Sequence, residues 1–207
     1  MYILILGRTK MSGASRCIGG LADDGRSVRL QKADGTHWDF NAPFQVGQIW
    51  DVTYIFSQNC TPPHTEDVIV TRYRYVRTEP HVRDYLLKRL QPWQGGIGTL
   101  FNGVVRYTAN NNGYISADSV PAHSTWFWIP DRDLTLRNDS KHYDYPLDPT
   151  MPALMPRGLS YVGEPPPLQT IQAGTLVRVS LARWWKPNDA APDFKERCYL
   201  QLSGWFL

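Results

Sequence analysis

The chain has 207 residues, enough for one large β domain or two small ones, and either can bury a core without disulfides or metals. With 42% hydrophobic and 20% charged residues it is neither disordered nor fibrous, and its 16 prolines and 16 glycines indicate many turns and few long helices. A net charge of +3 permits an anionic partner but falls short of the clustered basicity of a strong duplex binder.

The first expected strand is the continuous apolar run at 2–6, which is typical of a strand covered on both faces. A second follows at 27–31, where Val28 and Leu30 alternate with polar residues. The next, at 47–56, also alternates, and a further strand is expected at 67–76. In the strand at 47–56, alternation predicts one inward face that carries Trp50, Val52, Tyr54 and Phe56.

One helix is expected, at 80–90, because Pro80 fits a first turn and apolar residues follow at helical spacing. The stripe consists of Val82, Tyr85, Leu86, Leu87 and Leu90. We predict that this helix bridges the two halves of the chain.

The second half returns to strand patterns, which we place at 100–108, 125–129, 134–137, 176–184 and 198–207. The segment 143–167 is proline-rich and lacks periodicity, so a regular helix is excluded. We interpret it as an inserted, extended surface loop.

An internal repeat is suggested by two strands that each begin at a glycine, 47–54 and 174–181. Their alignment superposes Trp50, Val52 and Tyr54 on Val177, Val179 and Leu181. A short strand precedes each copy, at 26–31 and at 133–138, although any two amphipathic strands led by glycine would align comparably. A duplicated half has too few strands for a sandwich and suits a five-stranded barrel.

The fold class predicted from these patterns is all-β, mainly strands with one or two short helices, arranged as two tandem OB-like small barrels. The expected domains are a first barrel at 1–79, a bridging helix at 80–95, and a second barrel at 96–207 that contains the insertion at 143–167.

Several segments of the sequence are similar to those of a known family: 3–10, 17–20 with 25–30, 44–50, 62–68 and the C-terminal segment 198–205. In these segments the chain resembles the prokaryotic dual OB-containing domain family. The resemblance implies a tandem OB fold and a role in bacterial conflict or defence as a module that senses nucleic acid or nucleotides. These motifs are structural, so they imply fold more directly than activity, and they bring no catalytic residues with them.

Enzymatic signatures are absent from the sequence, which contains no GxSxG, no Walker-type loop, no HExxH and no Rossmann fingerprint. We therefore expect no enzyme and no cofactor. The best local cluster is His64 with Glu66 and Asp67, which could perform acid/base chemistry or hold a cation. A turn that uses these groups locally explains the same residues, and we favour it.

The three cysteines, Cys17, Cys60 and Cys198, are far apart and show no metal-ligand spacing, so we expect free thiols in a reducing compartment and no metal site. The N-terminal run lacks the features of a signal peptide, and no stretch approaches the ~20 apolar residues of a spanning helix. A cytoplasmic protein without membrane contact is expected.

Two groups of cations could contact phosphate. Arg8 and Lys10 follow the first strand, so we expect them to be exposed at a barrel mouth, where a solvated turn is the equal alternative. Arg72 and Arg74 share one face of a strand and could follow a phosphate backbone. The tyrosines between them, on the other face, are interpreted as core partners.

The third group is Arg183, Trp184, Trp185 and Lys186, in which adjacent tryptophans cannot both point inward. An exposed tryptophan flanked by cations suits stacking on an unpaired base, while capping of the barrel or docking between the halves explains it nearly as well.

The function predicted from the sequence is a non-catalytic binding or sensor module for single-stranded nucleic acid or a nucleotide. The alternative is a protein-interaction module that docks on an effector protein encoded nearby and binds no nucleic acid, since interfaces are rich in Trp, Tyr and Arg.

Overall fold

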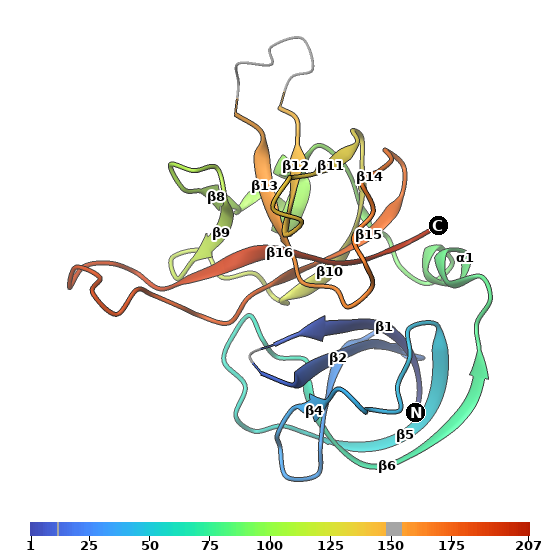
Figure 1. The fold of residues 1–207 in the computed structure, drawn as a ribbon. Coiled ribbons are helices and arrows are strands. Elements are labelled where there is room, and N and C mark those ends of the chain that lie inside the picture. Colours follow the sequence, from blue (N-terminus) through green and yellow to red (C-terminus); the bar gives the residue numbers. More distant parts are fainter. Residues whose placement is uncertain (12, 148–154) are drawn as a thin grey trace.

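The first third of the chain closes into a five-stranded barrel in a computed structural model that describes residues 1–11, 13–147 and 155–207 (Figure 1). The strands follow the order β1-β2-β3-β6-β5 and return to β1. Only β3 and β6 run parallel. This is the connectivity of an OB barrel. The strands of this half are β1 (Tyr2–Lys10), β2 (Ser15–Ala22), β3 (Ser27–Gln31), β4 (Trp38–Asp39), β5 (Gln48–Phe56) and β6 (Asp67–Thr78).

The second barrel uses the same strand order with a bent first strand. β10 pairs with β15, β11 pairs with β12, and residues 131–133 join β10 to β11. The ring then runs β12-β13-β16-β15, with β13 parallel to β16. These strands are β10 (Thr125–Pro130), β11 (Leu134–Leu136), β12 (His142–Tyr145), β13 (Arg157–Tyr161), β15 (Leu176–Leu181) and β16 (Arg197–Phe206).

Short elements flank the second barrel. β14 pairs with β11, β7 pairs with β10, and β8 and β9 extend the sheet from β16. Their bounds, with a 3₁₀ segment η1, are β7 (Trp93–Gly95), η1 (Ile97–Gly103), β8 (Arg106–Tyr107), β9 (Gly113–Ser116) and β14 (Thr170–Ile171).

The repeat of glycine-led strands is confirmed by the pairing. Gly47 and Gly174 both adopt positive φ, at 88° and 81°, and each donates its N–H at 2.9 Å to a carbonyl of its barrel's first strand. Val177, Val179 and Leu181 lie in one core, and Trp50, Val52 and Tyr54 in the other, as expected. Phe56 does not join them, because it ends β5 at the barrel rim, where it is 55% exposed.

Three expectations from the pattern were wrong. The counterpart of β3 is β13, which also pairs in parallel with the last strand, and not the segment at 133–138. Residues 100–108 begin as a 3₁₀ turn in which Phe101 and Asn102 adopt positive φ, so the expected strand is reduced to β8 near its end. The segment 143–167 supplies most of β12 and all of β13, with Tyr143 and Leu159 buried in the core, rather than a surface insertion; its residues 148–154 lie outside the described part.

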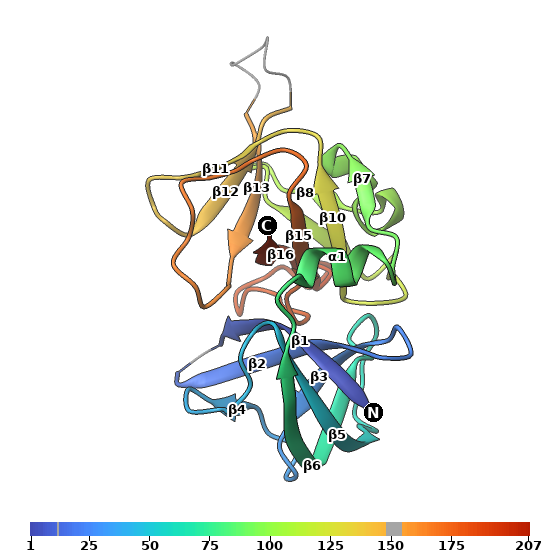
Figure 2. The same ribbon diagram turned by 90° about the vertical axis from the view of Figure 1, so that its right-hand side faces the viewer.

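The barrels pack directly on each other (Figure 2). The helix α1 (Val82–Leu87) is shorter than expected and lies beside the seam. Its Leu86 is fully buried in a cluster that joins both barrels, whereas Leu87 faces solvent. This shared cluster comprises Leu4, Leu6, Leu21, Ile49, Leu86, Phe127, Leu176 and Phe206. In the described part of the chain, no helix is long and apolar enough to cross a membrane.

Candidate functional site

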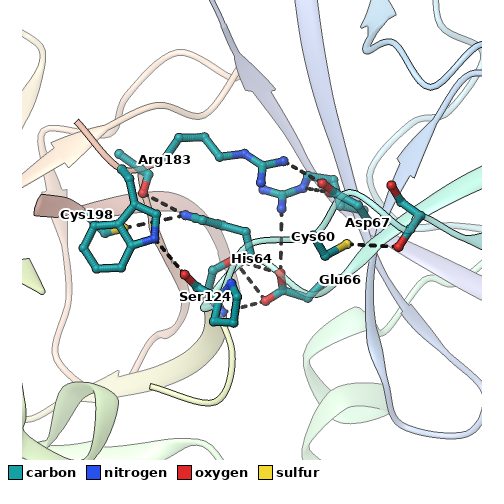
Figure 3. A network of polar contacts seen from close by, with 12 residues as sticks. Cys60, His64, Glu66, Asp67, Ser124, Arg183 and Cys198 are labelled. Carbon is teal, nitrogen blue, oxygen red and sulfur yellow. Dashed lines mark hydrogen bonds and ion pairs between the residues drawn. The ribbon is translucent and has the colours of Figure 1, made fainter. Parts of the chain in front are cut away.

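The loop between β5 and β6 forms a large part of the polar seam between the barrels (Figure 3). His64 is fully buried, and its Nε2 lies 3.0 Å from the Ala182 carbonyl and 3.7 Å from the Cys198 thiol. Burial, together with the Arg29 and Arg183 guanidiniums, lowers the pKa of His64 to about 4. The imidazole is therefore neutral at pH 7 and donates its Nε2–H to the carbonyl.

The two carboxylates beside His64 bind different partners. Glu66 accepts hydrogen bonds from the Ser124 backbone N–H at 2.6 Å and from the Ser124 hydroxyl at 3.0 Å. Asp67 pairs with Arg29 of its own barrel and, at 2.6 Å, with Arg183 of the other. Burial alone would raise the pKa of Asp67, but the two guanidiniums hold this pKa below its usual value. The carboxylates thus fasten one barrel to the other.

The favoured interpretation of this cluster as a turn is confirmed for the backbone, since the His64 N–H donates to the Thr61 carbonyl at 2.9 Å. It missed the side chains, which reach across the seam (Figure 3). For His64 to act as an acid or base, a substrate would have to reach its imidazole, and this side chain has no exposed surface. Within the described residues, no three His, Cys, Asp or Glu side chains gather as a potential metal site.

As expected, only one of the two adjacent tryptophans is largely exposed to solvent. Trp184 packs on the second core, and its indole Nε1 donates a hydrogen bond of 2.7 Å to the Pro62 carbonyl across the seam. Trp185 is 52% exposed, and Lys186 beside it is also exposed. The docking role considered for this pair is therefore confirmed for Trp184.

A cleft of about 290 Å³ opens between the barrels, and we call it the inter-barrel cleft. The first barrel contributes Lys10, Cys17, Arg29 and Glu66 to its walls, and the second contributes Arg178 and Arg183. Four cationic side chains and one carboxylate therefore line a space close to the size of a small-ligand pocket.

Arg178 is the most unusual residue of the cleft. It lies on β15, is only 8% exposed, and is buried against the glycines of the facing barrel. A Cβ on Gly7 would lie 3.0 Å from its Nη1, and a Cβ on Gly19 would clash with its Nη2. Among the described residues, its guanidinium makes one hydrogen bond, from Nη1 to the Ser203 hydroxyl at 2.8 Å, and no ion pair. Burial lowers the pKa of Arg178, but an arginine remains charged in proteins.

Arg29 reaches the same cleft from β3. Its Nε is paired with Asp67, while its Nη2 is buried and lies 3.8 Å from Glu66, too far for a hydrogen bond. Within the described part of the chain, this Nη2 has no hydrogen-bond partner. Two guanidiniums in the cleft therefore carry N–H donors that the protein does not use.

The cleft coincides with the face that OB barrels use for ligands. That face consists of the second and third strands with the loops after the first and fourth. In the first barrel, Cys17 lies on β2, Arg29 on β3, Met11 in the loop after β1, and Glu66 at the end of the loop after β5. The second barrel covers this face and adds Arg178 to it.

The expectation that Arg8 is exposed was wrong. Arg8 is 5% exposed, and its guanidinium donates to the carbonyls of Phe40, Ala42 and Phe44 and pairs with Glu164. The residue holds the loop before β5 in place because every edge of its fork has a protein acceptor. Among the described residues, four of its five N–H donors already have protein acceptors, which leaves little for a phosphate.

The remaining predicted residues fall in two places. Lys10 and Arg183 lie in the walls of the inter-barrel cleft. Arg72 and Arg74 share one face of β6 as expected, but they line a separate depression with Asp51 and Thr53. The middle of β6 runs along the side of the first barrel away from the second (Figure 1). Tyr73 packs against Trp38, Phe44 and Trp50, as a core partner would, although it remains partly exposed.

Sequence reasoning missed Arg29 and Arg178 because alternation placed them on the outer faces of their strands, where solvent was expected. The outer faces of the two barrels meet, so these side chains are buried. A usable signal in the sequence was that Arg178 is the one charged residue of the run Leu176–Leu181, LVRVSL.

Comparison with known proteins gives one match. A family model described as a dual OB-containing domain covers residues 1–205. The chain therefore belongs to the dual OB-containing domain family, and this membership indicates a binding module in general terms. No curated protein and no solved structure matches the chain.

Proposed function

We propose that the protein is a non-catalytic module that binds a small phosphorylated molecule, with nucleotides as the first candidates, in the inter-barrel cleft. The observation that supports this most is the pair of largely buried guanidiniums, Arg29 and Arg178, which line a cleft of about 290 Å³ and whose N–H donors are only partly used by the described residues.

A buried charge is costly unless it is paired and hydrogen-bonded. Arg178 has one neutral hydroxyl as its partner among the described residues, so its desolvation is poorly compensated by the protein itself. A phosphate would supply both the opposite charge and several acceptor oxygens, which form short, charge-assisted bonds with guanidinium groups. Lys10 and Arg183 would add attraction at the mouth of the cleft.

A nucleotide fits this arrangement better than a long single strand does. The cleft is enclosed by both barrels and is close in size to a single small ligand. The cations that could guide a strand, Arg72 and Arg74, lie in a different depression, and Arg74 already pairs with Asp51 at 3.3 Å. Binding of a strand would need a continuous charged path.

The test is calorimetric titration of the full chain with inorganic pyrophosphate and with nucleoside 5′-monophosphates at low and moderate salt. We expect binding that falls at least tenfold in Arg178→Met, since a buried charge-assisted contact is lost. The double variant Arg72→Ala with Arg74→Ala is the matched control, because it removes more charge from a remote surface and should leave the affinity within about twofold at moderate salt.

Two outcomes would contradict the proposal. One is no binding of either ligand by the folded protein at low salt. The other is binding that survives in Arg178→Met but is lost in the double variant, which would move the ligand to β6 and support a single strand instead.

If neither ligand nor single strand binds, the protein-interaction alternative takes precedence. The exposed apolar residues on β5 and β6, Ile55, Tyr73, Tyr75 and Val76, favour it as the second candidate. Its partner would be an effector protein encoded nearby. The place of the protein in cytoplasmic bacterial defence stays a prediction, and genes for effectors adjacent to its own gene would support it.

A further inference from the structure

A second cavity of about 270 Å³ adjoins the inter-barrel cleft, and we call it the aromatic cavity. The two share Ser27, Val28 and Glu66 in their walls, so they are neighbours at the start of β3 and at the end of the loop before β6. The aromatic cavity is otherwise lined by Phe56 from the end of β5 and by His123 and Trp126 from the second barrel.

We propose that the aromatic cavity holds the base of a nucleotide whose phosphate lies against Arg29 and Arg178 in the inter-barrel cleft. This inference rests on the proposed function and specifies its ligand class as a nucleoside phosphate.

The walls of the cavity offer aromatic faces. Phe56 is 55% exposed, which is unusual for a large apolar side chain at a seam, and the Arg26 guanidinium lies 5.0 Å from its ring centroid. Across from it, the rings of His123 and Trp126 lie 5.0 Å apart and tilted by 40°. Bases bind between such faces because every base has a π surface.

Polar groups stand beside these faces. The His123 Nε2 is buried and has no hydrogen-bond partner among the described residues. Glu66 contributes its carboxylate to both cavities. Burial lowers the pKa of His123, so its ring is neutral and can serve one polar atom on the edge of a base. A purely apolar ligand would leave the His123 Nε2 unsatisfied, which disfavours it.

The chemistry of the two cavities therefore matches the two ends of a nucleotide. One is rich in guanidinium groups and suits the charged end, while the other is aromatic with a few polar atoms and suits the base. Together their volumes fall within the range of small-molecule sites, whereas a phosphate alone would leave the aromatic cavity unused.

The test compares ribose 5-phosphate with the four ribonucleoside 5′-monophosphates, which differ from it by the base. Affinities are measured by calorimetry on the full chain, with tryptophan fluorescence as a second readout, because Trp126 borders the cavity. We expect at least one nucleotide to bind roughly tenfold or more tightly than ribose 5-phosphate, the gain that stacking of one base supplies.

Variants of the cavity wall test whether the gain in nucleotide affinity arises in the aromatic cavity. Phe56→Ala should remove about fivefold or more of the nucleotide affinity and leave ribose 5-phosphate unaffected, while Phe56→Tyr should restore it by keeping an aromatic face. Ile55→Ala is the matched control, since Ile55 is the preceding residue, is equally exposed and lies outside the cavity wall.

The inference fails if all four nucleotides bind no tighter than ribose 5-phosphate, or if Phe56→Ala and Ile55→Ala bind nucleotides equally. In that case, anion binding that still depends on Arg178 leaves the proposed function standing. If neither ribose 5-phosphate nor any nucleotide binds to the folded protein, the proposed function and this inference both fail.

Discussion

Arg178 is the residue at which stability and the proposed binding make opposite demands. Its guanidinium is buried between two barrels with one hydroxyl partner among the described residues. Replacement of buried charged groups by apolar side chains of similar size is often neutral or stabilising. A buried charge with so few partners is typical of a binding site, where stability is commonly sacrificed for function.

We therefore expect Arg178→Met to leave the free energy of unfolding unchanged or to raise it by about 1 kcal/mol, while phosphate and nucleotide binding weakens. Urea denaturation of the ligand-free protein measures this. Gly7 and Gly19 leave room for the methionine. A loss of about 2 kcal/mol or more would mean that Arg178 chiefly holds the barrels together, contrary to this account.

His64 makes the stability of the protein depend on pH. Its pKa is about 4 in the folded protein and near 6.5 in an unfolded chain. Between these values the unfolded chain binds the proton and the folded protein does not, so stability is lost as the pH falls from about 6.5 toward 4.

Wild type should lose about 2–3 kcal/mol more than His64→Gln between pH 7 and pH 4. The glutamine amide can still donate to the Ala182 carbonyl but does not titrate. Denaturation curves of both proteins at several pH values give the comparison, and the other histidines cancel because both proteins retain them. Parallel losses of stability would show that the His64 imidazole is not sequestered.

For single residues, the sequence did not predict correctly which cationic side chains are exposed to solvent. Arg8 follows an apolar strand, as an exposed cation would, yet its guanidinium is enclosed by three carbonyls and Glu164. Arg29 and Arg178 alternate outward, as solvated cations would, yet they line the seam. Exposure depends on how two barrels dock, and that is a long-range property which local periodicity does not contain.

The loops that follow the fourth strand of each barrel together form a junction between the barrels. The loop at 57–66 and the start of the loop at 182–196 meet at the seam, where Trp184 donates to the Pro62 carbonyl and Arg183 pairs with Asp67. Since both loops occupy the same position in the duplicated plan, the two halves are joined through equivalent segments.

The adjacent tryptophans of the second loop provide a test of this junction. Trp184→Ala should lower the free energy of unfolding by about 2 kcal/mol or more, because packing and a hydrogen bond across the seam are lost. Trp185→Ala should cost about 0.5 kcal/mol, as is usual for an exposed side chain. Denaturant titration of both variants decides; equal costs would contradict the assigned roles.

Strands with clear alternation were predictable, and so was the repeat that glycine marks at Gly47 and Gly174. The failures arose where local composition and tertiary packing disagree. Prolines at 146 and 156 flank β12 and β13 without entering them, so a proline-rich segment still contributes two barrel strands. At 97–103, apolar residues form a 3₁₀ turn whose positive φ angles at Phe101 and Asn102 have no signature in an apolar pattern.

At the scale of the whole molecule, the inter-barrel cleft exists because two barrels of the same topology dock against each other. Each barrel has its own core, and a third apolar cluster joins them. The second barrel covers the ligand face of the first, so neither half alone encloses the inter-barrel cleft. The family resemblance predicted two OB barrels, but not this covering or the cations that it buries.

The most direct measurement is a crystal structure of the protein grown with a nucleoside 5′-monophosphate at saturating concentration. We expect phosphate density within hydrogen-bond distance of the Arg178 and Arg29 guanidiniums, with the ligand enclosed between the barrels. Density for the phosphate at Arg72 and Arg74, or none at Arg178 with the rest of the cleft well ordered, would contradict it.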